Sequence, residues 1–291
     1  MKVKGSTLAH RLIRSAVMFG FVWFIIQKES AQGLNYYVAP RMVPWVLFLA
    51  GGLSALALHQ LYLAIRHLAH AKQAEAACHC ASHGHDRWNT RAFVMYAALI
   101  TPLLLAYSFP DAILGSQMAA QKGLNLTPSD VLKVSASPGN SSTSSPAFAF
   151  NDYTKPYADR AADMYKQSLI TINDDLYIES LTSLDLYQDQ FVGKKVQLSG
   201  YVYRLDSMND SQFALGRFAM RCCVADSIPM GILVESDSSL EWKDDAYVVA
   251  LGTIKKRQIN GRSVLAIEAK TIQTQPSPQE PYVYGNPYFG A

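Results

Sequence analysis

The sequence predicts a protein of two parts: a membrane-embedded α-helical region with about three transmembrane helices, and an all-β or α+β domain built as a small barrel. Three observations lead to this prediction. An apolar stretch of bilayer length lies in the first half, and short alternating runs fill the second. The charge balance also changes, because residues 1–151 hold 12 Lys and Arg against 5 Asp and Glu, whereas residues 152–291 hold 14 against 18.

The composition divides the chain into three segments. Residues 1–115 are assigned to the transmembrane region, residues 116–152 to a linker, and residues 153–291 to the β-domain. The linker contains the run SASPGNSSTSS at residues 135–145, which has no apolar periodicity and is typical of a flexible spacer.

Residues 43–65 form the clearest membrane span. They contain no ionised residue, and at 1.5 Å per residue the helix is roughly 34 Å long, enough to cross a bilayer core. Residues 12–27 are shorter and carry Arg14 near their start, where a long side chain can reach the interface. A cleaved secretory signal is the alternative for this segment, but Lys28 and Glu29 disfavour cleavage there. Residues 93–113 form a third span, with a kink expected at Pro102.

The positions of the basic residues predict the orientation. Four Lys and Arg lie before or near the start of the first span and four more lie in the loop at residues 66–91, against only Lys28 and Arg41 in the loop between the first two spans. Because Lys and Arg are retained in the cytoplasm, we expect a multi-pass protein of the cell membrane with a cytoplasmic N-terminus. The loop at residues 66–91 would then be cytoplasmic and the β-domain extracytoplasmic.

The second half is predicted to form five or six strands, within residues 168–174, 194–206, 212–226, 230–236, 246–258 and 263–274. Short helices are expected at residues 156–169 and 180–192. Gly200 and Gly252 lie where a strongly bent strand has no room for a side chain, and Asn260-Gly261 is a strong hairpin signal. This combination resembles a five-stranded oligonucleotide/oligosaccharide-binding (OB) barrel.

The predicted cytoplasmic loop contains a dense group of metal-ligating residues: Cys78, His79, Cys80, His83 and His85. Thiolate and imidazole groups suit Zn²⁺ or another soft transition metal, and a reducing cytosol would keep the thiols available. The spacing is not that of a zinc finger, so an exchangeable site is the functional interpretation. The alternative is a polar loop without a ligand.

A second group, Cys222, Cys223 and Asp226, lies in the β-domain. Adjacent residues of a strand point to opposite faces, so we expect one thiol in the core and one outside, a geometry that disfavours a disulfide between them. Burial as a small hydrophobic residue is the alternative for each cysteine. Metal ligation or redox chemistry is the functional interpretation of an exposed thiol outside the cytoplasm.

Other signals are weaker. His59 and Gln60 lie inside the second span, and we expect them to make helix-packing contacts.

The sequence contains no Ser/His/Asp signature, phosphate-binding glycine loop or HExxH segment, so a non-enzymatic protein is expected. The mildly acidic second half argues against a nucleic-acid partner, because phosphate binding needs a concentrated basic face.

Several segments together resemble the YcgQ-like bacterial membrane proteins. They are GKKVQLSGYVYR from residue 193, RFAMRCCVADSIPMGILVES from residue 217, Trp242, ALGTI, the PYVYG tail, and the membrane exit PLLLAYSFPDAILGSQMAAQKG. The matching motif residues are Arg217, Phe218, Cys222, Cys223, Ala225, Asp226 and Pro229. The resemblance implies a role beside a YcgR-like permease, the two forming a two-component permease linked to metal supply.

Three hypotheses follow from the sequence. The first is an accessory subunit of a membrane permease complex, whose outer β-domain binds a ligand or the permease. The second is a membrane-anchored metal sensor or chaperone that uses the cytoplasmic Cys/His loop. The third, ranked lowest, is a thiol oxidoreductase using Cys222 and Cys223, because redox pairs normally have intervening residues and a helix N-terminus that lowers one thiol pKa.

Overall fold

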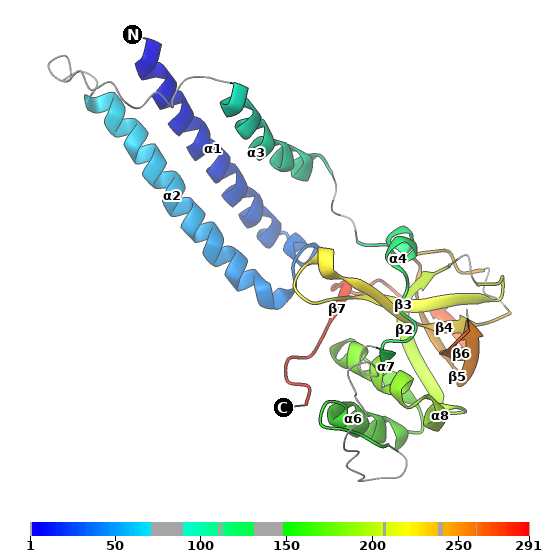
Figure 1. The fold of residues 1–291 in the computed structure, drawn as a ribbon. Helices are drawn as coiled ribbons and strands as arrows, with labels where there is room; N and C mark the ends of the chain where they lie inside the picture. Colours follow the sequence, from blue (N-terminus) through cyan, green and yellow to red (C-terminus); the bar gives the residue numbers. More distant parts are fainter. Residues whose placement is uncertain are drawn as a thin grey trace. The chain divides into compact units, whose positions relative to one another are not determined.

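The computed structural model describes residues 2–70, 90–109, 111, 113–130, 148–205, 208–237, 241–259 and 261–290. The chain divides into two compact units, residues 1–112 and residues 113–291. Figure 1 shows the helices of the first unit and the mixed α and β elements of the second.

The first unit is built from three helices, α1 (Lys2–Ser30), α2 (Val43–His70) and α3 (Thr90–Ser108), with short 3₁₀ turns at Gly33–Tyr36 and Pro40–Met42. Helices α1 and α2 lie side by side (Figure 1). The buried residues of α2 include Ala50, Ala57 and Ala64, which are seven residues apart and so share one face. Small residues at this spacing let two helices approach closely.

Two of the helices are long and apolar enough to cross a membrane, over Leu8–Ser30 and Pro40–Arg66. They contain the first two predicted spans. The apolar part of α3, Phe93–Ser108, is shorter, so three spans are not confirmed and the third remains a prediction. Polar contacts between the helices include Ser15 Oγ, which donates to the carbonyl of Ala57 at 3.0 Å.

The second unit contains a closed barrel of five strands: β2 (Lys195–Tyr203), β3 (Gln212–Met220), β4 (Ile228–Glu235), β5 (Tyr247–Ile259) and β6 (Arg262–Thr274). The strands pair in the order β2-β5-β6-β4-β3, and pairing of β3 with β2 closes the circle. All pairs are antiparallel except β4 with β6. This order, with its one parallel pair, is that of an OB barrel.

Glycines allow the barrel to close. A Cβ atom at Gly200 would lie 2.8 Å from the carbonyl oxygen of Gly216, and one at Gly216 would lie 2.3 Å from that of Met230. A Cβ at Gly252, beside a register shift, would lie 2.3 Å from the carbonyl oxygen of Glu268. Backbones therefore cross here more closely than any side chain permits, as predicted for Gly200 and Gly252.

Additional elements flank the barrel: α4 (Ser116–Lys122), α6 (Lys155–Tyr165), α7 (Tyr177–Leu186) and α8 (Gln188–Phe191), with strands β1 (Ile170–Ile172) and β7 (Tyr282–Tyr284). Strand β1 adds parallel to β2, and β7 adds parallel to β3. The helix predicted at residues 180–192 is thus two helices, and β7 was not expected. Three residues are too short a run for alternation to indicate a strand.

Part of the segment assigned to the linker belongs to the folded second unit. Residues 116–122 form α4, and Asn125 makes a β-bridge to Met230 of β4. Ser129 is buried and donates from its backbone N–H and its hydroxyl to Asp185 of α7, at 2.9 and 2.6 Å. The sequence pattern did not indicate this, because these contacts join residues far apart in the chain.

Candidate functional site

The first candidate site lies in the turn that follows β3. Strand β3 ends at Met220, and a 3₁₀ turn covers Val224–Asp226. Asp226 folds back along the chain and accepts the backbone N–H groups of Arg221 and Cys222 at 2.9 and 2.7 Å. The carboxylate is thereby held beside the two cysteines.

The thiols of Cys222 and Cys223 point to the same side of the turn. Their Sγ atoms are 3.8 Å apart, both cysteines are free, and both are partly exposed. The potential ligand atoms of Cys222, Cys223 and Asp226 all lie within 4.8 Å of one another. The prediction that the cysteines point to opposite faces was wrong, because the strand ends before them and side chains alternate only along extended, paired backbone.

Lys122 at the end of α4 supports this turn from outside. Its Nζ donates to the carbonyl oxygens of Ala225 at 3.1 Å and of Ser227 at 2.8 Å, with a longer contact to that of Val224. One ammonium group therefore binds several carbonyls of the turn that carries Asp226. Sequence reasoning missed Lys122, because it lies about a hundred residues away in a segment assigned to the linker.

The electrostatics of the turn favour the protonated form of the Cys222 thiol. The adjacent carboxylate of Asp226 and the neighbouring Cys223 thiol raise the pKa of Cys222 to about 11. Burial alone would raise the pKa of Asp226, but hydrogen bonds from Cys222 and from backbone N–H groups hold it below its ordinary value. A thiol with a high pKa is a poor nucleophile, and because the thiolate is also the metal-binding form, a metal ion must displace the proton of Cys222 in order to bind.

The other predicted metal ligands, Cys78, His79, Cys80, His83 and His85, lie outside the described residues. Zinc binding by this loop therefore stays a prediction.

A second group of motif residues surrounds Arg217 of β3. Its guanidinium is fully buried and donates to Asp174 and to the carbonyl of Glu280, the latter at 2.7 Å. It also lies near the ring faces of Tyr201 and Tyr247. Because β7 pairs with β3 beside it, the two motifs RFAMRCC and PYVYG meet in space. A cavity of about 440 Å³ adjoins them, lined by Asp174, Asp175, Glu280 and residues 282–288.

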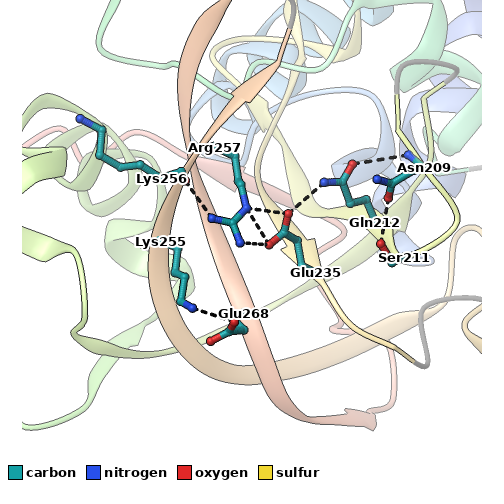
Figure 2. Close-up of polar contacts among 8 residues, drawn as sticks. All are labelled: Asn209, Ser211, Gln212, Glu235, Lys255, Lys256, Arg257 and Glu268. Carbon is teal, nitrogen blue, oxygen red and sulfur yellow. Dashed lines mark hydrogen bonds and ion pairs between the residues drawn. The ribbon is translucent and has the colours of Figure 1, made fainter.

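The basic run of β5 is paired with carboxylates. Figure 2 shows the guanidinium of Arg257 facing Glu235, which also accepts a hydrogen bond from Gln212 at 2.9 Å. Lys255 pairs with Glu268 at 2.7 Å (Figure 2), and Lys256 with Asp189 at 2.7 Å. Cations that are paired with carboxylates make a poor phosphate-binding surface. This pairing and the acidic composition of the second half both disfavour phosphate binding.

A cavity of about 450 Å³ lies where OB barrels commonly bind ligands, between the β2–β3 loop and the β5–β6 hairpin. Leu205 lines it from the loop, and Ile259 and Arg262 line it from the hairpin. Residues 124–127 line it as well. A ligand entering this face would therefore contact the segment that leads away from α4.

Two family models match the chain, one in each of its two parts. Residues 13–125 match the model of the DUF1980 N-terminal domain, and residues 147–285 match that of the DUF1980 C-terminal domain. Among solved structures, a small single-stranded DNA-binding protein from Streptomyces coelicolor aligns with 28% of this chain and 94% of its own, at 13% identity and a TM-score of 0.20.

Two curated relatives cover most of the chain. UPF0703 protein YcgQ of Bacillus subtilis (strain 168) is 25% identical over 208 residues, 66% of this chain and 68% of the relative. A Streptococcus mutans protein named "Putative two-component membrane permease complex subunit" is 23% identical over 214 residues, 69% of this chain and 77% of the relative. With both of its units matched in order, this membrane protein belongs to the YcgQ-like DUF1980 family.

Proposed function

We propose that this chain is a non-enzymatic accessory subunit of a membrane permease complex and that its partner is a YcgR-like permease. The observation that carries the proposal is the combination of apolar helices and a barrel in one chain that is similar to a protein named as a subunit of such a complex. In this arrangement α1 and α2 contact the permease within the bilayer, and the barrel lies on the extracytoplasmic side.

The outward face of α2 supports a helix–helix contact with the partner. Gly51, Ala55 and His59 follow one another at four-residue spacing, and all three are exposed. They lie on a different face from Ala50, Ala57 and Ala64, and a Cβ at Gly51 would meet no atom within 4 Å. Small residues at this spacing are typical of close helix contacts in membranes.

His59 strengthens the argument. Its imidazole makes no hydrogen bond within the described part of the chain, and it is exposed inside the span Pro40–Arg66. An imidazole facing lipid without a polar partner is unfavourable, and polar residues in spans usually face another helix. The helix-packing contact expected for His59 is therefore assigned to the permease rather than to α1 or α3.

Co-purification tests the proposal. The tagged full-length chain is co-expressed with a YcgR-like permease and purified in mild detergent, and the permease is expected to be retained in stoichiometric amount. His59→Leu should lower the retained permease several-fold. Leu49→Ala, which truncates an exposed side chain on another part of α2, serves as the matched control and should leave it unchanged. Reproducible loss of the permease with the unsubstituted chain would reject the proposal.

A further inference from the structure

The separation of the two thiols in the turn after β3 matches one particular metal geometry. The Sγ atoms of Cys222 and Cys223 are 3.8 Å apart. Two sulfurs that bind one tetrahedral ion at about 2.3 Å lie about 3.8 Å apart, since that is the edge of the tetrahedron. A linear ion with two thiolates at a similar bond length would separate them by about 4.6 Å. A tetrahedral ion would therefore fit the two sulfurs where they lie, whereas a linear ion would require them to move apart.

The third donor completes one face of that tetrahedron. The ligand atoms of the two cysteines and of Asp226 lie within 4.8 Å of one another, a spread that small side-chain rotations can close. The backbone N–H groups of Arg221 and Cys222 hold the Asp226 carboxylate in place. Lys122 holds the carbonyls of the same turn, so the three donors are arranged before any ion arrives.

We propose that Cys222, Cys223 and Asp226 form a mononuclear site for a borderline-soft divalent metal ion of the zinc class. Two thiolates and one carboxylate suit Zn²⁺ and exclude hard cations such as Mg²⁺ and Ca²⁺, which take oxygen ligands. Three protein donors leave one tetrahedral position for water or for a donor from another molecule. All three side chains are partly exposed, so an ion can enter and leave.

Binding is coupled to proton release. Each thiol gives up its proton as its sulfur binds, so one divalent ion replaces up to two protons while the carboxylate binds as it is. Affinity should therefore fall as the pH is lowered.

An open, exchangeable ion site is suited to transfer of the ion to another molecule rather than to structural stabilisation. The site stands on its own geometry and does not depend on the proposed permease role.

The experiment uses the full-length chain in detergent with Cys78→Ser and Cys80→Ser. The chain has four cysteines, so Cys222 and Cys223 are then the only thiols. The reduced protein is titrated with Co²⁺, whose thiolate charge-transfer absorption is not produced by histidine or carboxylate ligands alone. We expect this absorption to saturate at one Co²⁺ per chain and to disappear when Zn²⁺ is added.

Matched variants in this background test each donor. Cys222→Ser with Cys223→Ser should abolish the absorption, and Asp226→Asn, which keeps both thiols, should weaken Co²⁺ binding by at least about tenfold. Lys122→Met keeps all three donors and should weaken binding less than Asp226→Asn. Circular dichroism checks that each variant retains its β-structure.

Three results would overturn the site. The first is a protein with two titratable free thiols that gives no thiolate–Co²⁺ absorption. The second is an unchanged affinity in Asp226→Asn, because the three-donor geometry would then be wrong. The third is saturation at one Co²⁺ per two chains, which would reject a mononuclear site within one chain.

Discussion

Arg217 and Asp174 form an ion pair between a fully buried guanidinium and a half-exposed carboxylate. The Nη1 of Arg217 donates to both carboxylate oxygens of Asp174 at 2.9 Å, and side-chain exposure is 0% for the arginine and 48% for the aspartate. The carboxylate thus compensates, from the edge of the barrel, a charge that has no access to water. The pair connects β3 with the 3₁₀ turn that precedes α7.

Asp174→Asn should destabilise the barrel because it leaves the charge of Arg217 buried with only neutral partners. Removing one member of a fully buried pair costs about 3–5 kcal/mol, and the exposure of Asp174 reduces our expectation to about 2 kcal/mol. Hydrogen exchange of peptides from β2 to β6, measured by mass spectrometry on the detergent-solubilised chain, reports the change. Asp175→Asn is the matched control and should have little effect. Equal exchange in the two variants would contradict the prediction.

Gly216→Ala should prevent normal closure of the barrel. The new Cβ would lie 2.3 Å from the carbonyl oxygen of Met230 and 3.0 Å from Cα of Gly231, both backbone atoms. Neither can move without separating β3 from β4, so we expect a loss of more than about 2 kcal/mol.

Gly285→Ala provides the control for this substitution. Its nearest contact would be an ordinary 3.7 Å to Glu179, so thermal unfolding followed by circular dichroism should be almost unchanged. If the Gly216→Ala protein had the same melting temperature as the unsubstituted protein, β3 and β4 would have to be farther apart at this crossing than the structure shows.

Glu235→Gln should reduce stability at neutral pH but not in acid. Burial alone would raise the pKa of Glu235, yet the hydrogen bonds from Arg257 and Gln212 hold it below its ordinary value. A lowered pKa in the folded state stabilises the fold above the unfolded pKa, about 4.3, and this stabilisation is lost as the pH falls through the folded pKa. We expect a difference of about 1 kcal/mol at pH 7 that starts to shrink as the pH falls below the unfolded pKa and vanishes below the lowered, folded pKa.

Unfolding curves for Glu235→Gln at several pH values give this difference directly. Glu268→Gln, which removes the more exposed partner of Lys255, should show a smaller effect at pH 7. A Glu235→Gln difference that persists at low pH would exclude the charge as its cause.

Glu179→Gln should have the opposite pH dependence. Glu179 is almost fully buried, and this burial raises its pKa. Its contribution to stability is therefore complete below the unfolded pKa and is lost as the pH rises through the raised, folded pKa. The glutamine carbonyl can still accept the Asn286 N–H that now binds Oε1 at 2.8 Å. The variant should equal the unsubstituted protein near pH 4 and exceed it in unfolding free energy at pH 7. A less stable variant at pH 7 would show that the carboxylate itself is required.

The sequence by itself determined the local elements of this protein. The uncharged run at residues 43–65 has only one way to satisfy its backbone in a bilayer, a helix of that length, and α2 follows it. Alternation along residues 194–206 and 246–258 indicates strands with one buried face, and the Asn260-Gly261 dipeptide predicts a hairpin, consistent with the pairing of Ile259 in β5 with Arg262 in β6. These signals are local because period and turn chemistry involve neighbouring residues.

Only the tertiary structure decided how distant segments meet. Closure of the barrel depends on Gly216 lying against Gly200 and Met230, and the turn with Cys222 and Cys223 depends on Lys122 reaching it from α4. The predicted direction of the two thiols was wrong for the same reason. Their direction depends on where β3 stops pairing and not on residue order. Such contacts depend on the path of the whole chain and on backbone shape, which no periodicity in a short stretch of sequence contains.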